Sequence, residues 1–131
     1  LFQLMKFKDE EPVVEVFNAN HPKMTAKHWE KTHRRADWGR MIVDAMKFCL
    51  TIKYEQSEVF RQELKRSCCL FIVEDQSTFS KKTPDTWRET AGDHYEGPNL
   101  MGRLLMELRD NNGKLDSKLP DDVLGFIRFL K

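Results

Sequence analysis

Apolar residues recur at helical spacing through much of the chain, and this pattern predicts a mainly helical protein. The strongest segment begins after Asp37 and keeps one apolar face for about five turns, as far as Ile52. We expect this segment to be the central helix, with Asp37 as its N-cap. A second clear helix is expected to begin at Asn99, because Pro98 stops any helix that precedes it.

Weaker patterns predict the remaining elements. Residues 1–9 resemble the tail of a helix, and Pro12 can start a short helix that runs through Phe17. Ser57 is a good N-cap for a further helix that ends near Ser67. The other expected segments are a helix over about 24–33, a strand over 68–73, a long loop over 75–98, a helix stop at 111–113 and a short helix over 121–131.

The length of 131 residues matches one domain, so we expect a single compact helical domain with one or a few short β-strands. The segment 114–131 is expected to be a C-terminal extension of this domain. The chain opens at Leu1 without a methionine and already inside an apolar pattern. We therefore expect further sequence before Leu1.

The charges and cysteines narrow the class of protein. The sequence has 22 Lys and Arg residues and 21 Asp and Glu residues, so its net charge does not favour binding to nucleic acid or to an anionic membrane. No apolar run approaches the roughly 20 residues of a membrane span. The three cysteines include the adjacent pair Cys68 and Cys69, which is a poor disulfide framework. These features indicate a reducing intracellular compartment, either the cytoplasm or, in a eukaryote, the nucleus.

One stretch, residues 21–35, is strongly basic, with Glu30 as its single acid. Within it Lys23, Lys27 and Lys31 repeat every four residues and form a stripe on a helix. Such a stripe is either an ordinary solvated face or a surface that follows the phosphate backbone of DNA or RNA. The histidines of the stretch lack the spacing of a metal site, so no metal is expected.

The start of the helix at Asn99 is a candidate anion site. The first N–H groups of a helix lack intrahelical partners, and the helix dipole places positive charge there. Gly97 would let a phosphate approach the backbone closely. The alternative is a plain capped helix of the core that binds nothing.

Several segments, in the same order, resemble the NADAR domain family of YbiA-like proteins. They are FQLMKF at 2–7, ADW at 36–38, MK at 46–47, KYEQ at 53–56, ELK at 63–65, LFIVE at 70–74, TPDTW at 83–87 and GPNLMGRLLMEL at 97–108. Two departures stand out. The Glu-His pair that precedes the Phe-Gln segment in the family would lie before Leu1, and Arg88 follows the loop tryptophan where the family commonly has glycine.

The resemblance implies a mainly helical N-glycosidase that acts on ribosylated bases without a cofactor. Two substrate classes follow from it: ADP-ribose attached to guanine in nucleic acid, and ribosylated pyrimidine intermediates of riboflavin synthesis. We expect the first class, so that the protein would reverse ADP-ribosylation of guanine in DNA or RNA. A third alternative is a module that binds ADP-ribose and releases it unchanged.

The resemblance makes Lys6 the catalytic candidate, as the amine that forms a Schiff base with the opened sugar. An amine attacks only in its neutral form, and burial among apolar neighbours favours that form. Without the resemblance, Lys6 would be a snorkelling lysine on the flank of a helix.

The remaining candidates are expected to bind the ligand. Trp87 would stack on a base or on the ribose edge, while Trp38 is either a second stacking surface or part of the core. Asp85 would hold ribose hydroxyls, although Pro-Asp is also common in turns. The pyrophosphate would lie against the backbone at Gly97 and Asn99, with Arg103 as its counter-charge and with the anomeric carbon in reach of Lys6.

Overall fold

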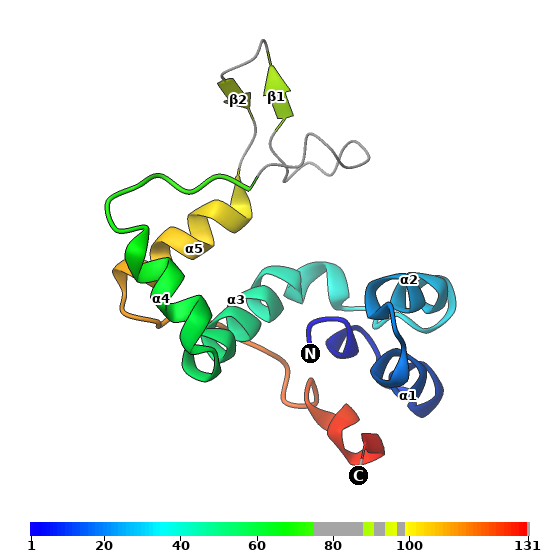
Figure 1. The fold of residues 1–131 in the computed structure, drawn as a ribbon. Helices are drawn as coiled ribbons and strands as arrows, with labels where there is room; N and C mark the ends of the chain where they lie inside the picture. The colour runs from blue at the N-terminus through cyan, green and yellow to red at the C-terminus, as the bar shows by residue number, and fades with distance from the viewer. Residues whose placement is uncertain (75–87, 91–93, 97–98, 131) are drawn as a thin grey trace. The chain divides into compact units, whose positions relative to one another are not determined.

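The computed structural model describes residues 1–74, 88–90, 94–96 and 99–130 (Figure 1). Helices dominate these ranges, which confirms the predicted mainly α class. The elements are the 3-10 helix η1 (Leu4–Lys6), α1 (Glu10–Asn18), α2 (Pro22–His33), α3 (Trp38–Gln56), α4 (Glu58–Arg66), β1 (Arg88–Thr90), β2 (His94–Glu96), α5 (Leu100–Asp110) and the 3-10 helix η2 (Gly125–Leu130). No helix in the described ranges is long and apolar enough to cross a membrane.

The chain divides into two compact units. The first comprises Leu1–Cys49 together with Asp116–Lys131, and the second comprises Leu50–Leu115. Each unit has its own cluster of buried hydrophobic side chains.

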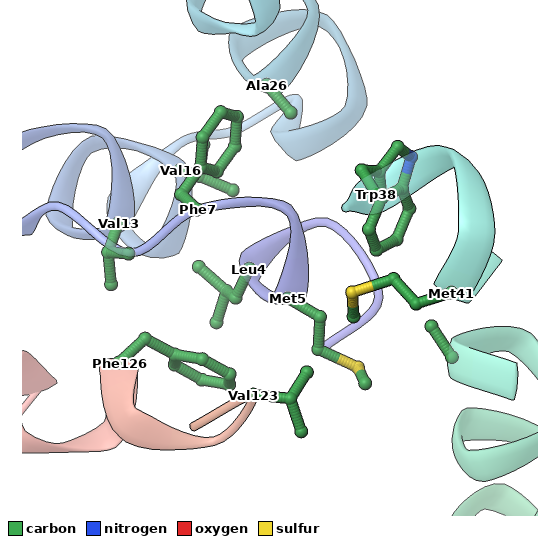
Figure 2. Close-up of a cluster of buried hydrophobic side chains, with 11 residues drawn as sticks. Leu4, Met5, Phe7, Val13, Val16, Ala26, Trp38, Met41, Val123 and Phe126 are labelled. Carbon is green, nitrogen blue, oxygen red and sulfur yellow. The ribbon is translucent and has the colours of Figure 1, made fainter. Parts of the chain in front are cut away.

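In the first unit, helices α1 and α2 pack against each other, and η1 and η2 both pack on α1 (Figure 1). Figure 2 shows Leu4 and Met5 of η1 in the middle of the core, with Val123 and Phe126 of the C-terminal segment facing them. Met5 is completely buried. The C-terminal segment therefore contributes two side chains to the core around η1.

The helices of the first unit begin where the sequence supplies suitable residues. Glu10 and Glu11 lie in the first turn of α1, where negative charge favours the helix dipole. Pro22 opens α2, a position at which the missing N–H costs nothing. The backbone carbonyl of Asp37 accepts hydrogen bonds from the N–H groups of Arg40 and Met41, which fixes the first turn of α3.

The second unit is built on α4 and α5. As predicted, Ser57 caps α4, and its Oγ accepts a hydrogen bond of 3.2 Å from the backbone N–H of Phe60. The core contains Leu64, Leu108 and Leu115, with aromatic and aliphatic neighbours packed around them. All of these core residues are in the unit's own span.

The predicted stop after α5 is confirmed, and the first hydrogen bond of this C-terminal motif runs from the N–H of Asn112 to the carbonyl of Arg109 at 3.3 Å. Asn112 adopts the left-handed conformation with φ 55°, and the N–H of Gly113 donates to the carbonyl of Leu108 at 2.8 Å. Gly113 has φ 91°, and a Cβ atom there would overlap the ring of Tyr54. Only glycine satisfies both conditions, so the position is fixed by the backbone and by packing together.

Two of the predicted elements differ in the structure. Residues 1–9 are not the tail of an α-helix, because η1 ends at Lys6 and Phe7 is extended and pairs with Arg34 in a β-bridge. Residues 68–73 are not a strand. Cys69 has a positive φ of 69°, and no described strand pairs with this segment. In both segments tertiary contacts override local propensity.

The strands that the structure does contain lie within the stretch predicted as a long loop. β1 and β2 form an antiparallel pair in which Glu89 lies opposite Tyr95. The C-terminal helix predicted over 121–131 is present as the 3-10 helix η2.

Candidate active site

The backbone around Lys6 is held by a segment that is distant in sequence. Lys6 is the last residue of η1, and its carbonyl accepts a hydrogen bond of 2.8 Å from the N–H of Arg35. The β-bridge between Phe7 and Arg34 continues the same contact. The backbone of Lys6 is therefore fixed by the segment that joins α2 to α3.

The side chain of Lys6 points into a site made of one carboxylate and two aromatic rings. Its Nζ lies 2.7 Å from Oε1 of Glu30 in α2, and the two side chains are 11% and 28% exposed. The same Nζ lies 5.8 Å from the ring centroid of Phe2 and 5.7 Å from that of Trp38. The amine is thus largely shielded from solvent, and its nearest acidic group is Glu30.

This arrangement can move a proton and present a nucleophile. A lysine attacks only after its ammonium group has lost a proton, and Glu30 is within hydrogen-bond distance to accept that proton. The aromatic rings of Phe2 and Trp38 meet edge to face at 5.2 Å and restrict the space in which the Lys6 side chain can move. The first unit therefore contains an amine and a carboxylate that are already paired.

A second buried cation, Arg35, connects the segment beside Lys6 to the C-terminal segment. Its side chain, 2% exposed, donates to Asp37 at 2.8 and 3.0 Å and to Asp122 at 2.9 Å. Hydrogen bonds from Arg35 hold the pKa of Asp37 and of Asp122 below the usual value of an aspartate. Lys8 adds a second ion pair to Asp122, at 3.3 Å. The carboxylate of Asp37, the residue expected as the N-cap of the central helix, therefore forms an ion pair with Arg35.

Trp38 belongs to the hydrophobic core in this structure. Its side chain belongs to the same buried cluster as Met5 and Met41, and the residue is only 3% exposed (Figure 2). It nevertheless lies beside the Lys6 amine, so the structure brings together two of the residues that the sequence singled out. Whether its ring also contacts a ligand stays a prediction.

A shallow pocket of about 510 Å³ opens at the start of α3. It is lined by Asp37, Arg40, Met41, Lys118, Leu119 and Pro120. Lys6 and Trp38 are not among these lining residues. We therefore place the candidate chemistry at the Lys6–Glu30 pair and not in this pocket.

In the second unit, Asn99 occupies the N-cap position of α5, but its side chain does not cap the helix. Its backbone is left-handed, with φ 48°, and its amide donates to the carbonyl of Ile72 at 2.7 Å while accepting from the N–H of Glu74 at 3.1 Å. Asn99 is 1% exposed. The side chain thus ties residues 72–74 to the start of α5, which corrects the expected capping role.

The contact between Asn99 and residues 72–74 explains why position 102 is a glycine. A Cβ atom at Gly102 would overlap the amide of Asn99 and the carbonyl oxygen of Ile72. The glycine therefore makes room for a side chain that crosses the first turn of α5.

Of the four other predicted ligand-binding residues, the structure describes one. Arg103 is exposed on α5, as a counter-charge would need to be. Asp85, Trp87 and Gly97 lie outside the described residues. The binding roles given to all four stay predictions.

The basic stripe is present on α2. Lys23, Lys27 and Lys31 are all exposed, whereas Ala26 of the same helix is completely buried in the core. The helix that carries the stripe also carries Glu30, the partner of Lys6.

Sequence reasoning missed three residues of the site: Glu30, Arg35 and Asp122. Glu30 carried a signal, because it is the single acid in the basic stretch 21–35. Arg35 and Asp122 are separated by 87 residues, and no local pattern pairs them.

The comparisons with known proteins agree with the resemblance. The model of the NADAR domain family matches residues 1–111, which include Lys6, Glu30, Trp38 and Asn99. Searches of the curated proteins and of the solved structures returned no match. Since the family model covers most of the sequence, the chain belongs to the NADAR domain family.

Proposed function

We propose that the protein is an N-glycosidase that removes ADP-ribose from guanine in nucleic acid. Its family is generally associated with N-glycosidase activity. The observation that carries the proposal is the shielded pair of Lys6 and Glu30, with Nζ and Oε1 2.7 Å apart. A paired amine and carboxylate can supply a nucleophile and a proton carrier for cleavage of a ribose–base bond.

The chemistry begins when Glu30 accepts a proton from the ammonium group of Lys6. The neutral Nζ then attacks the anomeric carbon of the ribose, through a transition state with oxocarbenium character. The bond from this carbon to the base nitrogen breaks, and the base leaves with the proton that Glu30 held. The sugar ring opens to a protonated Schiff base on Lys6. Addition of water then releases ADP-ribose and restores the amine.

The exposed stripe on α2 supports a nucleic-acid substrate. Lys23, Lys27 and Lys31 present three positive charges on the helix that also positions Glu30. Lysines at this spacing can contact successive phosphates of a nucleic-acid backbone. A small pyrimidine substrate would have no use for such a surface.

The test is a single-turnover assay with an oligonucleotide that carries ADP-ribosylated guanine. We expect release of ADP-ribose and recovery of unmodified guanine by the wild-type chain. We expect no release by Lys6→Arg, which keeps the positive charge beside Glu30 but cannot form a Schiff base. Lys65→Ala, which alters an exposed lysine of α4, is the matched control and should retain turnover.

Two outcomes would contradict the proposal. Binding of the oligonucleotide with the modification left intact would indicate an ADP-ribose-binding module. Turnover of ribosylated pyrimidine intermediates of riboflavin synthesis, independent of salt and without activity on the oligonucleotide, would indicate the other substrate class of the family.

A further inference from the structure

Two adjacent cysteines, Cys68 and Cys69, follow α4 and have no part in the chemistry proposed above. Both are exposed, and their Sγ atoms lie 3.3 Å apart. The backbone of Cys69 has φ 69°, a conformation that residues other than glycine rarely adopt. The turn therefore places two thiols side by side at the surface of the second unit.

The turn is held by hydrogen bonds on both sides of the cysteine pair. Nη1 of Arg109 donates to the carbonyl of Ser67 at 3.0 Å and to that of Leu70 at 2.8 Å. The N–H of Leu70 also donates to the carbonyl of Ser67 at 2.9 Å. Because the turn is already closed, a ligand that needs both thiols has little ordering cost to overcome.

The covalent geometry disfavours a disulfide between these neighbours. Disulfides usually join Cα atoms roughly 4.4–6.8 Å apart. Consecutive Cα atoms across a trans peptide are only about 3.8 Å apart. Closing an S–S bond between Cys68 and Cys69 would therefore distort the backbone, whereas two S–X bonds to one bridging atom X span the gap between the sulfurs.

The number of ligands selects the kind of bridging atom. A structural zinc ion requires about four protein ligands. Among the residues that the structure describes, no group of three or more His, Cys, Asp or Glu side chains could hold a metal ion. Trivalent arsenic forms three bonds, so an organic arsenical needs two protein sulfurs and brings its third substituent with it.

We propose that Cys68 and Cys69 form a dithiol site that binds one trivalent organic arsenical. With an arsenoxide, two As–S bonds form, the As=O bond is lost, and the oxygen leaves as water with the two thiol protons. Arsenic stays trivalent, so no oxidant or reductant is needed. The hydrogen bond with Cys69 raises the pKa of the Cys68 thiol, and the smaller thiolate fraction of Cys68 slows its oxidation.

The test uses phenylarsine oxide and the full chain, with intact mass spectrometry as the readout. We expect one phenylarsenic group per chain, bound in the presence of excess glutathione and removed by a dithiol competitor. Two linked thiols hold a common ligand at least about 100-fold more tightly than one. Cys68→Ser and Cys69→Ser should therefore each lose the adduct when glutathione is added.

Cys49→Ser is the matched control, because Cys49 lies in the first unit and is half-buried. It should bind phenylarsine oxide as the wild type does. Arg109→Gln tests the ordered turn and should weaken binding while leaving both thiols in place. Retention of the adduct by Cys68→Ser, or failure of the reduced wild type to form it, would overturn the proposal.

Discussion

The Nζ atom of Lys6 lies 2.7 Å from Oε1 of Glu30, although the two residues are 24 positions apart in the sequence. The contact joins η1 to α2 in the core of the first unit. Trp38 borders it, and the hydrogen bond from the N–H of Arg35 to the Lys6 carbonyl fixes the backbone beside it. The amine of Lys6 therefore has a defined place, with the carboxylate of Glu30 within hydrogen-bond distance.

The first prediction concerns Glu30→Gln, which keeps the size of the side chain but removes its capacity to take a proton. We expect single-turnover cleavage of ADP-ribosylated guanine to slow by about 10²–10⁴-fold, the range for loss of a general acid–base group. Glu11→Gln is the control, because Glu11 is exposed on α1 of the same unit. Equal rates for Glu30→Gln and the wild type would remove Glu30 from the mechanism.

The second prediction concerns the ion pair between Arg35 and Asp122. Asp122→Asn should lower the free energy of unfolding at pH 7 by about 1 kcal/mol, since Asp122 is half-exposed and Asp37 still pairs with Arg35. Urea denaturation measures this change. Asp121→Asn, the exposed neighbour, should have no comparable effect.

The same pair predicts a pH dependence of stability. Arg35 lowers the pKa of Asp122 in the folded state. The contribution of Asp122 to folding stability is therefore complete above the unfolded-state pKa of about 3.9, and it is lost as the pH falls through the lower folded-state pKa. The wild type should therefore lose more stability than Asp122→Asn between pH 5 and pH 2. Parallel stability curves for the two proteins would contradict this assignment.

The third prediction compares two glycines that both lie in helices. Gly102→Ala should destabilise the protein by about 2–3 kcal/mol, because the new Cβ would break the hydrogen bonds of Asn99 to residues 72–74. Gly39→Ala, where nothing lies within 4 Å of the added atom, should stabilise it by up to about 1 kcal/mol. Thermal or urea unfolding distinguishes the two, and effects of the same sign would contradict the contacts described for Gly102.

The fourth prediction concerns the stripe on α2. Replacing Lys23, Lys27 and Lys31 together by Glu should abolish binding of the modified oligonucleotide at moderate salt. Lys27→Glu alone should weaken binding and lower the number of counterions released on binding by about one. Lys65→Glu on α4 should do neither. Binding that responds equally to the two single changes would indicate that the stripe is only a solvated face.

The helices could be predicted from the sequence because local signals agree there with tertiary packing. The apolar face from Trp38 onward and the cap at Ser57 both correspond to observed features of α3 and α4. The strand expected over 68–73 was wrong because apolar composition alone cannot reveal the left-handed turn at Cys69. Hydrogen bonds from Arg109, far along the chain, hold that turn.

The candidate site was only half predictable, for a physical reason. Lys6 and Trp38 could be proposed from the sequence because they lie in short motifs shared with the family, and the structure places them side by side. Glu30 contacts a residue 24 positions away, and Asp122 contacts one 87 positions away. No periodicity or spacing in the sequence encodes contacts of this kind. Asn99 was identified, but its side chain bonds Ile72 instead of the helix end, because the left-handed backbone at Asn99 presents it to that segment.

The central claim is that Lys6 forms a covalent Schiff base with the ribose, and reductive trapping tests it most directly. The chain is mixed with an oligonucleotide that carries ADP-ribosylated guanine, borohydride is added, and the adduct is located by peptide mass spectrometry. We predict one adduct, on the peptide that contains Lys6, and none with Lys6→Arg. Turnover without a trapped adduct, or an adduct on a different lysine such as Lys8, would contradict the account.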